Sequence, residues 1–223
     1  AVLSAISLSI VAVAWLWARR LAGPMAGLLA AAIAAVWFDL VYFGAKPLTE
    51  ALASSALFAG AFLLSPAARP HRSALFAAGL LLGLAGVLRL HLAPAILVIA
   101  LAGCFRRPLK DWIACGVGGL LVAAASGILD WATWGYPFVS YWANVEANLV
   151  QGRASQYGVS PWYAYIALYV VIWSGFLVPL AILAVAGARR APMLLLVPLV
   201  IVASHSAIAH KEYRFILPAL PFV

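Results

Sequence analysis

The segment 210–215, which reads HKEYRF, places His, Lys, Glu and Arg side chains between two apolar stretches of a chain that is 67% hydrophobic and 9% charged. Charge in such a position is costly unless it faces water, a partner or a ligand. Lys211 and Arg214 are three residues apart, on one face if the segment is helical, and suit a phosphate group, because Arg offers a two-pronged donor and Lys a point charge. The alternative is a tight turn at the membrane surface in which Glu212 pairs with Lys211 or Arg214. This cluster is the first candidate for a functional site.

Three further charged residues interrupt apolar sequence upstream of the cluster. Arg89 lies between two apolar runs that, as helices of about fifteen residues, span roughly 22 Å and are shorter than the hydrocarbon layer. If its turn lies below the headgroups, Arg89 needs an anionic partner or water; at headgroup level it only snorkels to the surface. Lys46 and Glu50 flank a Pro that suits the first turn of a helix. They are expected either to cap that helix at the interface or to line a polar cavity.

The longest connection, residues 130–161, and the residues directly after it are rich in Trp and Tyr, among them Tyr157 and Trp162. Aromatic belts at membrane surfaces produce this composition. Residues 141–151 suit a short helix that lies in the interface, and residues 152–158 are turn-like. Alternatively, a loop of this kind covers the mouth of a cavity and holds a sugar by stacking and hydrogen bonding.

The elements that must position these residues are predicted from recurring apolar runs, each near the length that crosses a bilayer as a helix. Strands of a membrane barrel would alternate apolar and polar residues, and these runs do not. The sequence therefore predicts an all-α, polytopic transmembrane helical bundle with about nine hydrophobic segments. They cover approximately residues 1–18, 21–38, 48–64, 74–88, 92–105, 111–129, 162–187, 191–209 and 215 onward.

Basic residues are concentrated in every second connection between these segments. Those connections hold nine of the fourteen Lys and Arg residues and a single acid, so the net charge of +8 falls on one side. By the positive-inside rule that side is cytoplasmic. The net charge then reports topology and needs no nucleic-acid partner. Five of the six acids, and the 210–214 cluster, fall on the opposite, extracytoplasmic side, where we expect any active site.

The chain begins inside one apolar run and stops inside another. We therefore expect residues 1–223 to be a single transmembrane domain that is truncated at both ends.

Three segments carry a resemblance to a known family. Residues 210–218, HKEYRFILP, resemble the His-Lys-Glu-x-Arg-Phe-x-x-Pro signature of glycosyltransferase family 22, the polytopic GT-C mannosyltransferases related to the Alg9-type and GPI-anchor enzymes. Residues 157–165 are similar to the family's Tyr-Gly-x-x-Pro-Trp-x-x-Tyr element. Residues 46–52 match the corresponding element only weakly, which favours a divergent, bacterial member.

The resemblance implies a transferase that moves a hexose, typically mannose, from a polyprenyl- or dolichyl-phosphate donor to a glycan or glycolipid acceptor, with no cofactor and no metal. Lys211, Arg214 and Arg89 would bind the donor phosphate. Glu212 is the candidate catalytic carboxylate in this chain, although the main base is expected upstream of it. Candidate substrate-binding residues are His210, Lys46, Glu50, Tyr157 and Trp162.

Two other classes of protein share part of this pattern. A polytopic transporter or lipid flippase would also be basic on one side and would also carry sparse charges within its helices, but transporters often show internal repeats, and none is found here. A non-catalytic membrane subunit would lack an ordered polar cavity beneath the outer loops. If the protein is an enzyme of this kind, we expect it in a bacterial plasma membrane, or in the endoplasmic reticulum membrane of a eukaryote. Membrane lipids are then expected among its partners.

Overall fold

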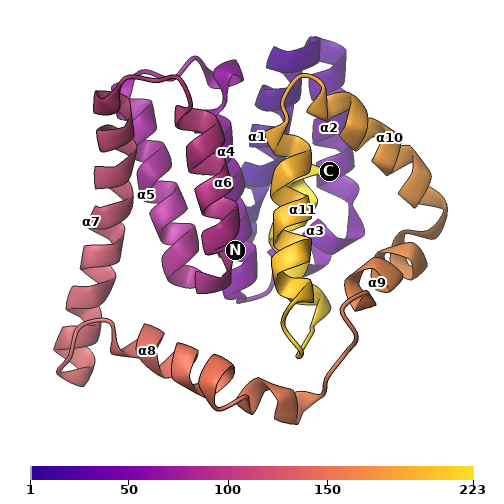
Figure 1. Ribbon diagram of the computed structural model, residues 1–223. Helices are drawn as coiled ribbons and strands as arrows, with labels where there is room; N and C mark the ends of the chain where they lie inside the picture. Colours follow the sequence, from indigo (N-terminus) through magenta and orange to yellow (C-terminus); the bar gives the residue numbers. More distant parts are fainter. Residues whose placement is uncertain (1) are drawn as a thin grey trace.

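The computed structural model describes residues 2–223, apart from the side chain of Leu149, and every regular element in that range is helical (Figure 1). The α-helices are α1 (Val2–Ala22), α2 (Pro24–Val36), α3 (Phe38–Gly44), α4 (Thr49–Leu64), α5 (Arg72–Leu88), α6 (Ala93–Cys104), α7 (Leu109–Trp134), α8 (Val139–Val145), α9 (Ala164–Trp173), α10 (Leu177–Ala188) and α11 (Met193–Ser206). Tighter or wider helical segments are η1 (Pro66–Ala68), η2 (Leu90–Leu92), η3 (Glu146–Val150), η4 (Arg153–Tyr157), η5 (Ser174–Phe176) and η6 (Tyr213–Phe222). The predicted all-α fold is confirmed.

Three stretches of the described chain are long and apolar enough to cross a bilayer: α1, α7, and α9 with α10 taken together. The bent pair α2 and α3 makes a fourth if it forms one span. α4, α5 and α11 are apolar but shorter, as is the stretch from η2 through α6. The chain is therefore a multi-pass membrane protein, and the number of complete crossings stays a prediction.

Helix α4 lies at the centre of the bundle. Twelve of its sixteen residues are buried, and it packs against α1, α5, α6 and η6. The sequence explains this position, because α4 is built largely from Ala, Ser and Gly, whose small side chains let neighbouring helices approach closely in a membrane. Glu50 lies in its first turn and is therefore drawn into the interior of the protein.

The closest helix pair, α5 and α7, is also formed by small residues. A Cβ atom added to Gly79 of α5 would lie 2.0 Å from the carbonyl oxygen of Cys115 on α7, and one added to Gly118 would lie 2.3 Å from the carbonyl oxygen of Phe76. The two backbones are thus in direct contact, which only glycine permits at these positions.

The predicted segment 21–38 ends earlier than expected. The backbone is extended at Trp37, and α3 begins at Phe38 with a bend of 56° from α2. Asp39 directly follows the predicted segment 21–38 and so falls in a predicted connection, but it is buried in the first turn of α3, with 3% of its surface exposed. The cause is a set of hydrogen bonds from distant residues to the Asp39 carboxylate, which sequence reading did not detect.

The predicted segment that starts at residue 215 is not an α-helix. It forms the 3-10 helix η6, which contains Pro218 and Pro221 and packs against α4 and α11. Proline lacks a backbone N–H donor, so it interrupts regular α-helical bonding. Consequently the HKEYRF motif continues directly into a buried, irregular segment at the core of the bundle.

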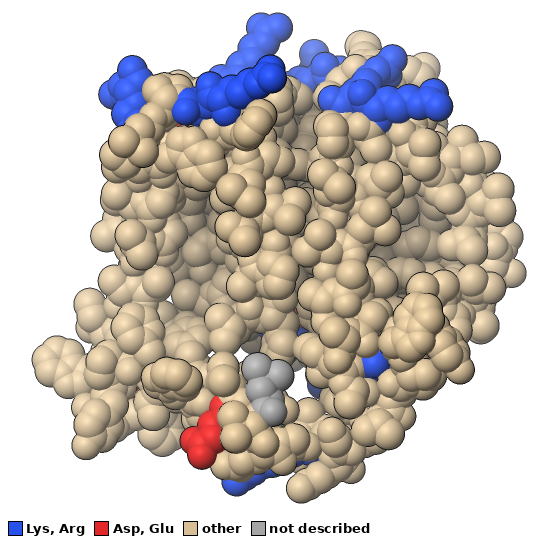
Figure 2. All heavy atoms as spheres, viewed as in Figure 1, with Lys and Arg blue, Asp and Glu red and all other residues tan. Residues whose placement is uncertain are grey.

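Lys and Arg side chains gather at one end of the molecule, at the top of Figure 2. The connections α1–α2, α4–α5, α6–α7 and α10–α11 lie at this end in Figure 1, as the charge pattern predicted. The connection between α7 and α9, which includes α8, lies at the opposite end and runs across the bundle there.

We call residues 135–163 the outer strap. The predicted interfacial helix is present in it as α8, followed by the π-helical η3. The strap is fixed to α7 at its start, where the buried carboxylate of Asp130 accepts hydrogen bonds from the backbone N–H (3.0 Å) and the hydroxyl of Ser140. Its aromatic side chains are largely exposed, including Trp142 and Tyr157. This exposure fits an aromatic belt at the membrane surface.

Candidate functional site

Glu50 is the centre of a group of charged residues at the outer end of α4. Its carboxylate is 4% exposed, and its Oε1 atom lies 3.3 Å from Nη1 of Arg89 and 3.6 Å from Nε of Arg214. Arg89 follows the last residue of α5, whereas Arg214 lies in η6. The sequence predicted that a buried Arg89 needs an anionic partner or water, and Glu50 is such a partner.

A second carboxylate completes the group. Glu212 places Oε2 2.6 Å from Nε of Arg214 and Oε1 3.1 Å from Nε2 of His210. Burial raises the pKa of Glu212, but the hydrogen bonds and positive charge of Arg214 and His210 outweigh it and hold that pKa below its usual value. Glu212 therefore carries a negative charge at neutral pH. It pairs with Arg214, which also lies close to Glu50.

The ring of Phe215 lies beside both guanidinium groups. The guanidinium carbon of Arg89 is 5.1 Å from the centre of this ring and that of Arg214 is 5.7 Å away, both within cation–π range. Burial lowers the pKa of Arg89 from its usual high value, and the charge of Glu50 opposes that shift. We call Glu50, Arg89, Glu212, Arg214 and Phe215 the arginine–carboxylate cluster.

Lys211 does not act with Arg214 in the way the spacing suggested. Its ammonium group donates hydrogen bonds to the backbone carbonyl oxygens of Ser160, at 3.0 Å, and of Ile208. The expected shared face requires a helix, but the backbone at Glu212 is extended and η6 begins only at the next residue. The condition for a shared helical face of Lys211 and Arg214 is therefore not met.

The end of the outer strap is tied to the HKEYRF motif. The backbone N–H of Ser160 donates to the carbonyl of Ala209 at 3.0 Å, and Nδ1 of His210 lies 3.0 Å from the carbonyl oxygen of Gly158. The hydroxyl of Tyr165 donates to the carbonyl of Glu212 at 3.3 Å. Two segments that the sequence singled out separately, 157–165 and 210–218, thus form one unit.

The remaining predicted site residues lie around this unit with fewer contacts. Tyr157 is 82% exposed, and its ring centre is 6.2 Å from that of His210. Trp162 is also exposed and packs edge-on against Tyr163. Lys46 makes its contact elsewhere, since its ammonium lies 3.7 Å from the centre of the Tyr42 ring. Of the two residues expected to cap α4 or to line a polar cavity, Glu50 thus contacts two arginines, whereas Lys46 contacts Tyr42.

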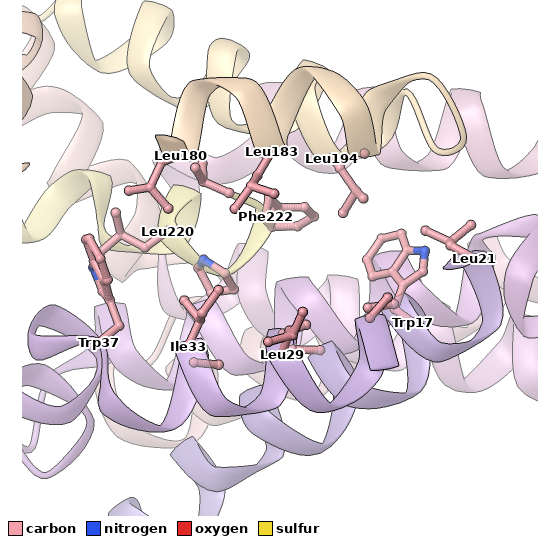
Figure 3. Close-up of a pocket in the computed structure, with 18 of the residues that line it drawn as sticks. Trp17, Leu21, Leu29, Ile33, Trp37, Leu180, Leu183, Leu194, Leu220 and Phe222 are labelled. Carbon is pink, nitrogen blue, oxygen red and sulfur yellow. The ribbon is translucent and has the colours of Figure 1, made fainter. Parts of the chain in front are cut away.

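An apolar cavity of about 420 Å³ lies on the other side of η6 (Figure 3). Its walls come from α1, α2, α10, α11 and the end of η6, and Figure 3 shows Leu180 and Leu183 facing Leu29 and Ile33 across it. Trp37 and Trp173 also line it, and Arg190 lines it as well. Because η6 contains both Arg214 and the cavity residue Phe222, one short element borders the charged cluster and the apolar space.

The fold and the site together define a polytopic helical membrane protein with an arginine–carboxylate cluster beside an apolar cavity. Comparison with known families assigns it further. Residues 1–223 match the model of the Alg9-like mannosyltransferase family, and the chain belongs to this family. The match agrees with the resemblance of the HKEYRF motif and does not favour the transporter alternative.

Individual relatives are mannosyltransferases. The chain is 27% identical over 210 residues to the "Probable Dol-P-Man:Man(7)GlcNAc(2)-PP-Dol alpha-1,6-mannosyltransferase" of Schizosaccharomyces pombe, an alignment that covers 90% of the chain and 36% of that protein. It is 34% identical over 104 residues to "GPI alpha-1,2-mannosyltransferase 3" of Xenopus laevis, covering 46% of the chain and 20% of that protein. The chain thus spans about a third or less of these relatives. No solved structure matches it.

Proposed function

We propose that this protein is a membrane mannosyltransferase that takes mannose from a polyprenyl- or dolichyl-phosphate donor and transfers it to a glycan or glycolipid acceptor. The observation that carries the proposal is the meeting of Arg89 and Arg214 on Glu50 at the outer end of the bundle. Membership of the Alg9-like mannosyltransferase family supports the proposed reaction. The name of the S. pombe relative contains a Dol-P-Man donor, which supports the proposed donor class.

In the proposed reaction, a hydroxyl oxygen of the acceptor forms a bond to the anomeric carbon of the sugar while the bond from that carbon to the phosphate oxygen breaks. The electron pair of the broken bond stays on the lipid phosphate, whose charge rises from one to two. The acceptor's proton passes to a general base. Catalysis then depends on groups that stabilise the phosphate as its charge develops.

Arg89 and Arg214 are the residues we assign to that role. A guanidinium carries five N–H donors, so a contact with one carboxylate leaves donors that can reach a phosphate. Arg214 is 40% exposed, and Glu212, its close partner, is 37% exposed, so the pair lies at an accessible surface of the protein. We assign Glu212 the role of orienting Arg214.

Lys211 and His210 take a different role in this proposal. Both hold the strap residues Ser160 and Gly158 against the motif, and this places Tyr157 near His210 at the rim of the site. Exposed aromatic side chains there suit stacking against a sugar. The apolar cavity suits an isoprenoid chain, because its walls are hydrophobic and it runs alongside the same element that carries Arg214.

The positive end of the bundle supports the proposed orientation. Lys and Arg gather at the end opposite the outer strap, and by the positive-inside rule this distribution supports an extracytoplasmic position for the arginine–carboxylate cluster. This is the side on which a lipid-linked sugar would meet its acceptor.

The test is transfer of labelled mannose from polyprenyl-phosphate mannose by the full-length protein in membranes. We expect Arg214→Ala to lower kcat by about 100-fold or more, in line with the loss of one preorganised donor to a developing charge. Arg214→Lys restores only part of the rate, because an ammonium lacks the two-pronged donor geometry.

Arg153→Ala is the matched control, since Arg153 is an exposed arginine of the outer strap outside the arginine–carboxylate cluster. We expect it to retain the wild-type rate. Unchanged transfer by Arg214→Ala would remove the role assigned to the arginines, and absence of transfer by the wild-type protein would remove the proposed function.

A further inference from the structure

Asp39 is a buried carboxylate that the proposed phosphate site does not use. Its Oδ2 atom accepts hydrogen bonds from the indole N–H of Trp37 at 3.0 Å, from the indole N–H of Trp173 at 3.3 Å and from the hydroxyl of Tyr213 at 3.0 Å. A buried acid is costly unless its oxygens are hydrogen-bonded. Three neutral donors on one oxygen supply that compensation, and they make Asp39 a junction between distant segments.

The three donors lie on separate elements. Trp37 precedes α3, Trp173 is the last residue of α9, and Tyr213 is the first residue of η6. An asparagine side chain is a weaker acceptor than a carboxylate and brings an N–H₂ group for which the two indole N–H groups offer no acceptor. The arrangement is therefore specific to an acid at position 39.

Two of these donors belong to the apolar cavity and the third belongs to the charged motif. Trp37 and Trp173 line the cavity and pack edge-on with ring centres 5.6 Å apart. Tyr213 stands between Glu212 and Arg214 in the chain. Asp39 therefore lies where the wall of the cavity meets the arginine–carboxylate cluster.

We propose that Asp39 is a positioning residue that sets Arg214 relative to the apolar cavity, so that a lipid chain in the cavity and its phosphate are held in register. This inference rests on the proposed function. Through Tyr213, Asp39 orients Arg214; through Trp173 and Trp37, it shapes the cavity wall. A misplacement of about 1 Å at a reacting group can lower a rate by about 100-fold, so a remote anchor of this kind affects catalysis directly.

Each arm of the junction can be removed separately; Tyr213→Phe changes the side-chain volume little, whereas Trp173→Phe also removes part of the cavity wall. Tyr213→Phe removes the hydroxyl that links Asp39 to the motif, and Trp173→Phe removes an indole N–H that links it to the cavity. The donors to be compared are mannosyl phosphates with a long polyprenyl chain and with a short citronellyl chain, which is too short to fill the cavity. Kinetics are measured on folded, full-length protein.

We expect Tyr213→Phe to lower kcat by about 10- to 100-fold for both donors, because Arg214 loses its anchor. We expect Trp173→Phe to raise KM several-fold for the long donor and to leave KM for the short donor unchanged. Asp39→Asn combines both effects, and adding Tyr213→Phe to it lowers kcat no further, because the same link is already broken. Asp39→Glu restores part of the rate.

Asp130→Asn is the control for loss of a buried, hydrogen-bonded acid, because Asp130 is similarly buried but anchors the outer strap to α7. We expect it to lack the chain-length effect. Wild-type kinetics in both Tyr213→Phe and Trp173→Phe, with kcat of Arg214→Ala still lowered, would overturn the role of Asp39 and leave the proposed function standing. Unchanged transfer by Arg214→Ala would remove the role of the arginines, and absence of transfer by the wild-type protein would overturn the proposed function; either result would overturn this inference as well.

Discussion

Glu50 joins residues that are far apart in sequence, since Arg89 and Arg214 reach it from α5 and η6. Removing one member of a buried ion pair is more harmful than removing both, because the remaining charge is left without compensation. In this cluster Arg89 is 21% exposed, so its charge has limited access to water. The structural importance of Glu50 follows from this low exposure.

Glu50→Gln is therefore expected to destabilise the folded protein by about 2–3 kcal/mol, less than the full cost for a completely buried pair. Thermal unfolding of the full-length protein in detergent measures the change. Glu146→Gln is the control, because Glu146 is exposed and is hydrogen-bonded to Gln151 on the outer strap. Equal melting temperatures for the two variants would contradict the assigned role of Glu50.

Glu212 gives the cluster a defined dependence on pH. Its pKa is lowered in the folded protein, so the folded state binds its proton less readily than the unfolded chain does. Its stabilising contribution is fully present above the unfolded pKa of about 4.3 and is lost as the pH falls through the lower, folded pKa. The contribution is about 1 kcal/mol or less, because the pair is partly exposed.

The measurement compares the melting temperatures of wild type and Glu212→Gln between pH 7 and pH 3. We expect a difference that is constant down to about pH 5 and disappears in stronger acid, because the wild-type carboxylate then becomes neutral. A difference that grows toward low pH would show that the sign of the shift is wrong.

The residue types of the site were predictable, but their pairing was only partly so. The apolar surroundings and the family resemblance of residues 210–218 singled out His210, Lys211, Glu212 and Arg214. The pairing of Glu212 with Arg214 was one of the alternatives and is confirmed. The contacts of Lys211 depend on the path of the outer strap, and no local spacing in the sequence encodes that path.

The α5–α7 pair shows how strongly one element depends on small residues. Gly118→Ala is expected to destabilise the protein by about 1–3 kcal/mol, because the new methyl group would lie 2.3 Å from a backbone oxygen of Phe76 and the helices must move apart. Thermal unfolding of the full-length protein tests this change.

Gly116→Ala is a matched control in the same helix. A Cβ atom at Gly116 has nothing within 4 Å, and alanine is the better helix former. We expect this variant to be at least as stable as the wild type. If both variants melt like the wild type, the close contact between α5 and α7 is not essential.

Helical segments were predicted well, because apolar runs bounded by basic residues give a strong signal in membrane proteins. The breaks within the predicted segments, however, were not predicted. Trp37 lies between α2 and α3 with no Pro or Gly beside it, and Ser174, with φ of 34°, begins η5 directly after the end of α9. Trp37 and Trp173, the residue before Ser174, both donate to Asp39. Long-range contacts, rather than local propensity, thus accompany both breaks.

Charge distribution over the entire molecule predicts its orientation. Ser73 lies near the basic end and Ser155 lies in the outer strap, and both are exposed. In a background with Cys104→Ala and Cys115→Ala, Ser155→Cys is expected to react with a membrane-impermeant maleimide added from outside intact cells or sealed, correctly oriented vesicles. Ser73→Cys is expected to react only after permeabilisation. The reverse pattern would contradict the orientation.

The charges of the arginine–carboxylate cluster are already balanced, because Arg89 and Arg214 face Glu50 and Glu212. An arriving phosphate ester therefore meets guanidinium groups whose charge is already compensated, and binding through their remaining N–H donors yields little net attraction. Small anions dissolved in water therefore gain almost no binding energy from the cluster and compete poorly with a phosphate that carries a hydrophobic tail. Under the proposed function, a ligand whose hydrophobic tail supplies most of the binding energy keeps its advantage, so we expect the cluster to discriminate by what is attached to the phosphate.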